Sequence, residues 1–346
     1  MKFDVAPAPH ARPTRTLRQV MGLVLLALIP AALVHVWMFG PGLIINALIA
    51  TLTAVAAEAA CLRLRGRAYE PAVADLSAVL CAVLLAFCLP PLTPWYVTAT
   101  GAAFAIVVAK QVYGGLGANL FNPAMAGYLV VLVSFPEAMT RWPALGDGNA
   151  LSWLDSARLI LIGAPPSTTW DAVTMATPLD QVRIELSQMR MLSEVLAGDA
   201  LPGRGAWLAF QIAAAAGGVA LLSLGIIRWQ LPVATLAGVI VAASALNLAD
   251  GDSYASAWFH LSTGSAVFAA MFIVTDPVTA ATSARGRLVF GFGIGVLAIV
   301  IRTFGAYPDG MAFAVLLMNA AVPLIDRVSV PRAYGHGSNR DTDTLS

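Results

Sequence analysis

The stretch VMGLVLLALIPAALVHVWM, residues 20–38, decides the fold class of this chain. It runs for 19 residues without Asp, Glu, Lys or Arg, and a helix of about 20 apolar residues can cross the hydrocarbon core of a bilayer. It is too long, and begins too far from the N-terminus, to be typical of a cleavable signal peptide. The sequence therefore predicts a first membrane-spanning helix here.

The rest of the chain repeats this pattern. Of its 346 residues, 59% are hydrophobic and 11% are charged, whereas a soluble globular domain has about 25% charged residues. We therefore predict an all-α polytopic membrane protein that crosses the bilayer about ten times. The predicted spans are 20–38, 43–62, 74–90, 95–112, 124–138, 206–227, 232–249, 259–275, 288–304 and 311–326.

Basic residues predict the orientation of these spans. Lys and Arg precede the first span and follow every second span, while the short opposite loops, such as 90–94 and 250–254, contain none. Because basic loops stay in the cytoplasm, both termini are expected there. The residues concerned are Arg12, Arg15, Arg18, Arg63, Arg65, Arg67, Lys110, Arg228, Arg285, Arg287, Arg327 and Arg332.

A long loop, residues 139–204, divides the chain into two halves of five predicted spans. We expect a cytoplasmic segment at 1–19, five-helix repeats at 20–138 and 205–327, and a cytoplasmic tail at 328–346. Three short matches occur in the same order in both halves, including AIVV before Lys110 and AIVI before Arg302. An odd number of spans in each half makes the two repeats inverted, and such repeats place ligand sites near broken helices at their interface.

Residues 110–124, KQVYGGLGANLFNPA, form the first candidate site. A loop with Gly114, Gly115 and Gly117 lets backbone N–H groups converge on an anion or a flat ligand. The alternative is a tight turn between two helices, with Asn122–Pro123 starting the next helix, because glycine and proline commonly mark turns.

Residues 275–279, TDPVT, form the second candidate site. Asp276, beside a proline that breaks the helix at the membrane boundary, is suited to bind a cation or the polar edge of a ligand. The alternative is that Asp276 only caps neighbouring backbone N–H groups. Asp309 is a further ion-pathway candidate, and we also expect it to pair with Arg302 across a short loop.

Residues 171–180, DAVTMATPLD, lie in the long loop. From the residues alone they are a turn rich in hydroxyl groups, with Pro178 ending any helix. Three cysteines cannot hold a four-thiolate iron–sulfur cluster, and four scattered histidines show no metal-ligand spacing. A net charge of +1 gives no indication of a nucleic-acid partner.

Six stretches together resemble the D subunit of the bacterial Rnf electron-transport complex, which is related to the B subunit of the sodium-pumping NADH:quinone oxidoreductase. The resemblance extends over residues 17–335 and implies two inverted five-helix repeats, similar to a urea-transporter fold. The stretches are residues 110–125, 176–180, 275–280, 286–291, 307–310 and 322–326.

This resemblance implies a covalently bound FMN. In the family, a threonine in the long loop carries FMN through a phosphoester bond that a flavin transferase makes outside the cytoplasm. The transferase acts on an Asp-x-x-Ser/Thr-x-Ala/Gly-Thr pattern, which Asp171, Thr174, Ala176 and Thr177 match. Thr177 is thus the expected attachment site, and the basic-residue pattern independently predicts the side of the membrane that the transferase requires.

The resemblance also implies an assembly in the bacterial inner membrane. The expected partners are integral membrane subunits, iron–sulfur subunits, a flavoprotein subunit that faces the periplasm, the flavin transferase, and Na⁺ or H⁺ as the coupling ion. It further implies a second, non-covalent flavin, riboflavin, for which the Gly114–Gly117 loop, Thr275 and Thr279 are candidate walls. The competing function is a small-solute channel or carrier without redox activity, which inverted repeats alone would favour.

The orientation is directly testable. A reporter enzyme that is active only outside the cytoplasm should be active when it is fused after Pro202 and silent when it is fused after Arg332. The reverse pattern would contradict the predicted topology and would deny a periplasmic transferase access to Thr177.

Overall fold

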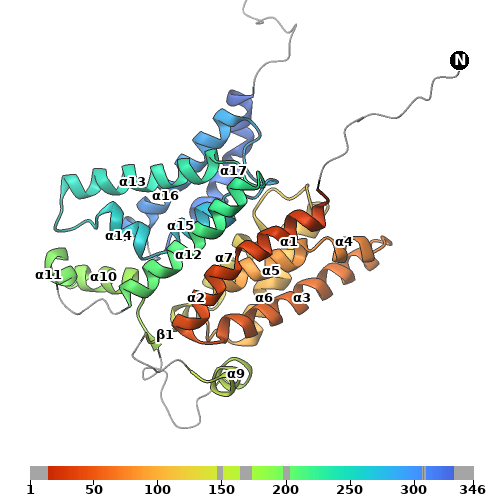
Figure 1. Ribbon diagram of the computed structural model, residues 1–346, viewed down its shortest axis with the longest axis horizontal. Coiled ribbons are helices and arrows are strands. Elements are labelled where there is room, and N and C mark those ends of the chain that lie inside the picture. Colours follow the sequence, from red (N-terminus) through yellow and green to blue (C-terminus); the bar gives the residue numbers. More distant parts are fainter. Residues whose placement is uncertain are drawn as a thin grey trace, which may run out of the picture.

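The computed structural model describes residues 15–145, 151–163, 174–197, 203–305, 307 and 309–330, and it is almost entirely helical (Figure 1). In these ranges the only strands are β1 (Trp142–Pro143) and β2 (Thr174–Met175), which pair antiparallel. This confirms the predicted all-α class. Polar backbone groups inside a helix are bonded within the helix, which is why apolar segments of this length become helices in lipid.

Seven helical segments within the described ranges are long and apolar enough to cross a bilayer. The first consists of two helices, α1 and α2, that meet at Leu28 because Pro30 stands in the first turn of α2. The segments are α1 (Leu17–Ala27) with α2 (Ile29–Phe39), α3 (Gly42–Leu64), α6 (Trp95–Phe104) with the π-helix η1 (Ala105–Val112), α12 (Arg204–Ser223), α13 (Gln230–Ala249), α16 (Ala284–Phe304) and α17 (Met311–Ser329).

The remaining three predicted spans are short or broken. α5 (Ser77–Cys88) and α7 (Pro123–Ser134) are apolar helices of 12 residues each. The expected continuous helix at 259–275 is instead α14 (Ala257–Ser262), α15 (Ala266–Phe268) and the π-helix η3 (Ala269–Ile273), with a break at Thr263–Ser265. The prediction of one straight span was therefore wrong here, since its apolar composition does not reveal where the backbone leaves the helix.

The connecting segments also contain short helices. They are α4 (Glu70–Ala74), α8 (Pro136–Thr140), α9 (Trp153–Ile162), α10 (Pro178–Ser187) and α11 (Leu192–Ala197). The expectation that Pro178 ends a helix was wrong, because Pro178 is the first residue of α10. Proline lacks an N–H that a first-turn residue would leave unpaired, and its fixed φ suits this position.

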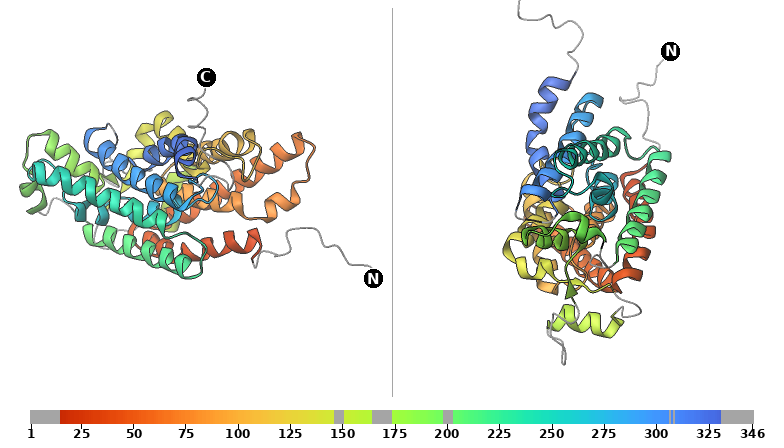
Figure 2. Two further views of the ribbon diagram at one scale, coloured as in Figure 1. Left: turned by 90° about the horizontal axis from the view of Figure 1, so that it is seen from above. Right: turned by 90° about the vertical axis from the view of Figure 1, so that its left-hand side faces the viewer.

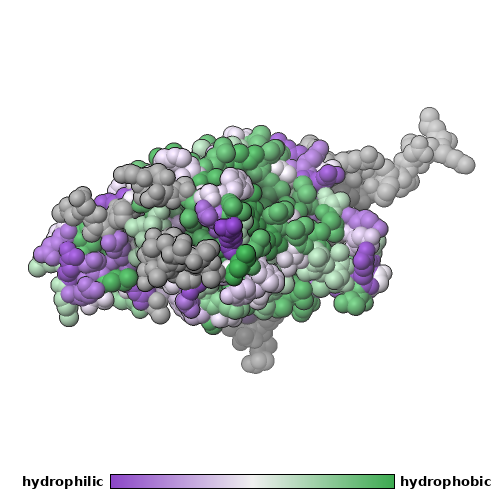
Figure 3. All heavy atoms as spheres, turned by 90° about the horizontal axis from the view of Figure 1, so that it is seen from below, coloured by the Kyte–Doolittle hydropathy of each residue, from purple (hydrophilic) through white to green (hydrophobic). Residues whose placement is uncertain are grey.

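Each half of the chain packs mainly within itself. α3 contacts α5 and α6 in the first half, and α13 contacts α16 in the second. A Cβ at Gly295 of α16 would overlap the carbonyl oxygen of Thr235 in α13, so glycine permits this close approach. Across the halves, α12 runs beside α2 (Figure 2) and α17 contacts α7. Figure 3 shows hydrophobic residues over the middle of one face and hydrophilic residues toward its two ends, as a membrane-spanning body requires.

Each half of the chain contains a buried cation, and the two cations make similar contacts within their own halves. Lys110 Nζ lies 2.6 Å from Glu58 Oε1 and donates to Ser77 Oγ at 2.7 Å. Arg302 Nη2 lies 3.1 Å from Asp309 Oδ1, which confirms the expected pair, and Nη1 donates to the His260 carbonyl at 3.3 Å. Each cation thus joins the fourth span of its half to the start of the third. Lys110 and Arg302 follow the matching stretches AIVV and AIVI in the two halves, and the inverted repeat itself stays a prediction.

Breaking the Lys110–Glu58 pair should destabilise the protein strongly. Glu58→Ala leaves a buried ammonium without its counter-charge, which costs about 3–5 kcal/mol. The midpoint of thermal unfolding of the purified protein in detergent measures this loss.

Glu137→Ala is the matched control, because the Glu137 side chain is 81% exposed in its pair with Arg141. Exposed pairs contribute about 1 kcal/mol or less. The double variant Lys110→Met/Glu58→Met removes both charges and should recover much of the lost stability. Equal losses in Glu58→Ala and Glu137→Ala would contradict a structural role for the buried pair.

Candidate functional site

Two cavities open at opposite ends of the helices. The first, which we name the Thr177 vestibule, has a volume of about 160 Å³, and the second, the Asp276 vestibule, about 120 Å³. Residues that define the Thr177 vestibule include His35, Phe87, Thr177, Trp207, Phe210 and Phe268. Residues that define the Asp276 vestibule include Ser77, Lys110, Asn119, Asn122, Thr275 and Asp276.

Thr177 is the N-cap residue of α10. Its Oγ1 accepts a hydrogen bond from the Asp180 backbone N–H at 3.2 Å and donates to Asp180 Oδ2 at 2.7 Å. A side-chain oxygen at this position satisfies a backbone donor that the helix cannot pair. Thr177 is half-buried, so its hydroxyl lies at the wall of the vestibule without being sealed in the core.

The Asp180 carboxylate is the nearest acidic group to this hydroxyl. Burial raises the pKa of Asp180, while the hydrogen bonds from Thr177 oppose that rise. Arg183, one turn further along α10, donates to the Gly305 carbonyl at 2.6 Å. The start of α10 is therefore tied to the loop between α16 and α17.

A small apolar cluster fixes α10 from its other side. Its buried members come from α10, α11, α14 and the segment before α14, and they are Val182, Leu192, Val195, Ala255 and Phe259. Although Thr177 belongs to the long loop between the halves, these contacts dock it against the second half. A side chain held in this way has a defined position relative to the vestibule wall.

Aromatic rings form much of the Thr177 vestibule wall. The ring centroids of Phe87 and Phe268 lie 5.1 Å apart, and those of Phe210 and Phe268 lie 5.7 Å apart. Trp207 and Phe210 meet edge-on at 6.5 Å. Such walls favour a flat, largely apolar ring system with a few polar groups.

The Asp276 vestibule is more polar. Asp276 Oδ1 accepts from the Val278 backbone N–H at 3.0 Å, and Oδ2 accepts from Thr279 Oγ1 at 3.2 Å. No ion pair with Asp276 forms in the described part of the chain. The carboxylate therefore caps a turn, as the structural alternative expected, and also lines a cavity that Lys110 lines.

The three glycines of the glycine loop turn the chain but do not themselves line either vestibule. Gly114, Gly115 and Gly117 all have positive φ, and the Gly115 N–H bonds back to the Lys110 carbonyl. These features support the tight-turn interpretation of this loop. Leu116, between Gly115 and Gly117, and Asn119 do line the Asp276 vestibule, and Asn119 Oδ1 is buried without a partner in the described residues.

Thr275 and Thr279 differ in position. Thr275 lines the Asp276 vestibule and donates to the Met271 carbonyl at 2.8 Å. The Thr279 hydroxyl donates to Asp276, and the Thr279 carbonyl accepts from Asn319 Nδ2 at 3.1 Å. Asp309 lines the Thr177 vestibule, where its carboxylate also accepts from the backbone N–H groups of Ser265 and Met311.

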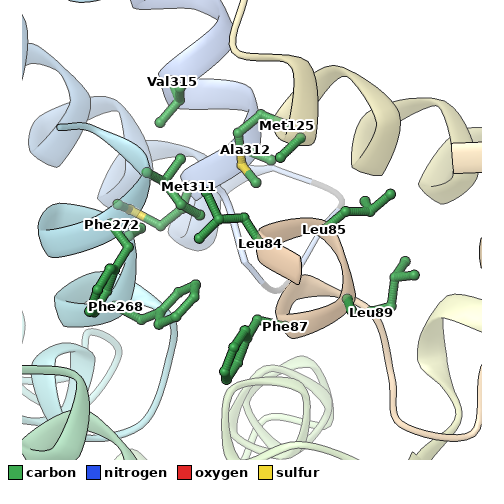
Figure 4. Close-up of a cluster of buried hydrophobic side chains, with 14 of the residues drawn as sticks. Leu84, Leu85, Phe87, Leu89, Met125, Phe268, Phe272, Met311, Ala312 and Val315 are labelled. Atoms are coloured by element: carbon green, nitrogen blue, oxygen red, sulfur yellow. The ribbon is translucent and has the colours of Figure 1, made fainter. Parts of the chain in front are cut away.

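Apolar side chains form a layer between residues that line the two vestibules, and Figure 4 shows part of this layer. Phe87 and Phe268 line the Thr177 vestibule, whereas Leu84 and Phe272, one helical turn away on the same segments, line the Asp276 vestibule. Met125 of α7 and Met311 of α17 pack in the same cluster. The short α5 and the broken span supply most of this layer, so they bring the two cavities close together.

The structure thus divides the predicted site residues between two places. Thr177 and Asp309 share one vestibule, Thr275 and Asp276 share the other, Thr174 lies in β2, and Asp171 lies outside the described residues. Asn119 lies in the candidate stretch 110–124 but was given no role of its own, and sequence reasoning did not select His35, Trp207 or the phenylalanines. Their apolar surroundings gave no signal of a site, except that a histidine inside a span is itself unusual.

Comparison with known proteins is consistent with these features. Residues 4–335 match the model of the NQR2, RnfD, RnfE family. The chain is 44% identical to the D subunit of the ion-translocating oxidoreductase complex of Aeromonas hydrophila, over 96% of this chain and 99% of that protein. It is 42% identical to the protein of the same name in Shewanella sediminis, over 98% and 99%. The corresponding values for Vibrio cholerae are 44%, 97% and 100%.

Proposed function

The chain belongs to the NQR2, RnfD, RnfE family, and on this premise we propose that it is the membrane flavoprotein subunit of an ion-translocating ferredoxin:NAD oxidoreductase complex. In this proposal it relays electrons between the ferredoxin side and the NAD side through FMN bound covalently to Thr177. The electron flow drives Na⁺ or H⁺ across the bacterial inner membrane. Both chain termini are cytoplasmic, in keeping with the basic-residue pattern.

The position of Thr177 carries this proposal. Its hydroxyl lies where a half-buried helix start meets a cavity with aromatic walls. A phosphoester at Oγ1 would put the phosphate at the N-terminus of the ten-residue helix α10, where backbone N–H groups and the helix dipole favour an anion. Asp180 Oδ2 already accepts the hydrogen bond of this hydroxyl, so it would take the proton as Oγ1 displaces the leaving group from the phosphorus of the flavin donor that the transferase supplies.

The aromatic walls are suited to the ring system of the same group. Phe87, Phe210 and Phe268 offer ring faces and edges, and they exclude water from the end of the cavity. A flavin supplies transfer of one or two electrons without thiolate ligands. That chemistry fits a chain whose three cysteines are free and too few for a cluster with four thiolate ligands.

We propose the Asp276 vestibule as the site of a second, non-covalent flavin, riboflavin. Lys110 provides a buried cation, and Asn119 provides an unpartnered acceptor, so a ligand with polar ring edges would find complementary groups. Thr275 belongs to this wall, whereas Gly114, Gly115, Gly117 and Thr279 would act by shaping the turns behind it. We assign Asp276 to the ion pathway, because its carboxylate lines the vestibule without an ion-pair partner among the described residues.

The partners follow from the assembly that the relatives' names describe. A ferredoxin:NAD oxidoreductase needs iron–sulfur subunits, further integral membrane subunits and a periplasm-facing flavoprotein subunit, and a flavin transferase must modify Thr177. A solute channel or carrier is the competing function. The apolar layer of Leu84, Phe87, Phe268 and Phe272 disfavours it, because a polar solute would lose its hydration there without compensation.

Thr177→Ala should abolish the covalent flavin while the protein still inserts into the membrane. Thr177→Asn is the sharper variant, because asparagine keeps the N-cap acceptor but has no hydroxyl to esterify. Intact-mass analysis and in-gel flavin fluorescence of the purified chain measure the result.

Thr140→Ala is the control for this experiment, since Thr140 is another hydroxyl residue of the vestibule wall and should leave the flavin in place. Retention of the full flavin mass in Thr177→Asn would show that a different residue is modified. A wild-type chain without flavin would favour a channel or a structural subunit.

Asp276→Asn should preserve assembly and the Thr177-linked flavin but lower electron-transfer-coupled ion uptake. Asparagine caps a turn nearly as well as aspartate, so a capping role alone predicts an almost silent change, whereas loss of an ion-binding carboxylate does not. Ion uptake into vesicles, normalised to complex content, measures the difference, and wild-type uptake would leave Asp276 as a cap only.

A further inference from the structure

His35 is a buried polar side chain in the Thr177 vestibule that none of the motifs includes. It lies on α2, where its exposed fraction is 3%, and it forms part of the cavity wall. Its ring neighbours are Phe39, Phe87 and Phe210, with centroid distances of 5.0, 5.9 and 5.9 Å. The imidazole is thus enclosed by aromatic carbon and faces the cavity.

Neither ring nitrogen of His35 has a hydrogen-bond partner among the described residues. A neutral imidazole carries one donor and one acceptor. A buried polar group without a partner has lost its hydration without gaining a hydrogen bond. An imidazole with both nitrogens unpaired therefore destabilises the folded protein unless a ligand pairs with it. Buried polar groups of this kind call for a specific explanation.

Two more groups of the same wall share this property. The Trp207 indole N–H and the Ser265 hydroxyl are buried without partners in the described part of the chain, and both residues line the Thr177 vestibule. Three unpaired hydrogen-bonding groups around one aromatic cavity point to a flat ligand with a polar edge. The pyrimidine edge of a flavin alternates carbonyl oxygens with an N–H, so it is complementary to the donors and acceptors of these three side chains.

We propose that His35 is the hydrogen-bond partner of the polar edge of the flavin ring in the Thr177 vestibule, with the Trp207 N–H as an additional donor. The inference rests on the proposed function and adds the side chain that orients and tunes the ring. A donor aimed at a ring carbonyl stabilises the electron-rich reduced ring more than the oxidised ring, because charge develops there on reduction. His35 therefore raises the reduction potential of the bound group.

The test compares His35→Phe with wild type in the purified complex that carries the Thr177-linked flavin. We expect full flavin content by mass, and a lower midpoint potential in a redox titration followed by visible absorbance. A ten-fold loss in the relative stabilisation of the reduced ring corresponds to about 30 mV for a two-electron couple. His35→Gln, which keeps a donor and an acceptor, should restore much of the difference.

His260→Phe is the matched control. His260 is also buried with an unpartnered Nδ1 in the described residues, but it does not line the Thr177 vestibule, so its loss should leave the potential unchanged. His35→Leu repeats the loss with a smaller side chain in case His35→Phe does not assemble. An unchanged potential in these His35 variants, or an equal shift in His260→Phe, would overturn the role of His35 and leave the flavin at Thr177 intact. A wild-type complex without flavin would instead overturn the proposed function and this inference together.

Discussion

Backbone polar groups at membrane depth must find partners within the protein, and the broken span of the second half depends on this constraint. Where the helix opens at Thr263–Ser265, Gln211 of α12 donates to the Gly264 carbonyl and accepts from the Phe268 N–H. Asp309 accepts from the Ser265 N–H, and Arg302 donates to the His260 carbonyl. Irregular backbone is tolerated in a bilayer only where it is buried in protein or lines a cavity, and this break meets both conditions.

The same constraint links the two halves. Asn122 caps the first turn of α7, and its Nδ2 donates to the Ile273 carbonyl at the end of η3. Asn319 Oδ1 accepts from the Asn122 N–H, and its Nδ2 donates to the Thr279 carbonyl. Two buried asparagines thus satisfy the turn after the broken span and join α7 and α17 to it. Residues 275–278 of this turn line the Asp276 vestibule.

Much of the fold was predictable because its signals are local. The length of an apolar run determines whether a segment can span the bilayer, and the ten predicted spans all correspond to helical segments. The pairing of Arg302 with Asp309 was also predictable, since the two residues flank one short loop. The hydroxyl of Thr177 was recognisable from its motif, although its role as the N-cap of α10 was not, because Pro178 was read as a stop.

The features that were missed depend on tertiary contacts. The break at Gly264 is stabilised by Gln211, which is 53 residues away in the sequence. His35 and Trp207 belong to apolar stretches, and only their position at a common cavity identifies them as candidate ligand contacts. The sequence left the role of Gly114, Gly115 and Gly117 open between a turn and a ligand site, because positive φ in a turn and in a ligand-binding loop requires the same residue.

In the proposed function, the apolar layer between the vestibules constrains how ion movement and electron flow are coupled. The ring centroids of Phe87 and Phe268 lie 5.1 Å apart and those of Phe268 and Phe272 lie 5.5 Å apart, so neighbouring rings connect the walls of the two cavities. An ion cannot follow the same line, because an unpaired charge at membrane depth costs at least about 2.5–3.5 kcal/mol. Ion passage therefore requires either a separate route or a movement of α5 against the broken span. Asn122 Nδ2 and Asn319 Nδ2 donate to the carbonyls of Ile273 and Thr279 at the end of that span, so a movement of the span relative to α7 and α17 would have to break these bonds.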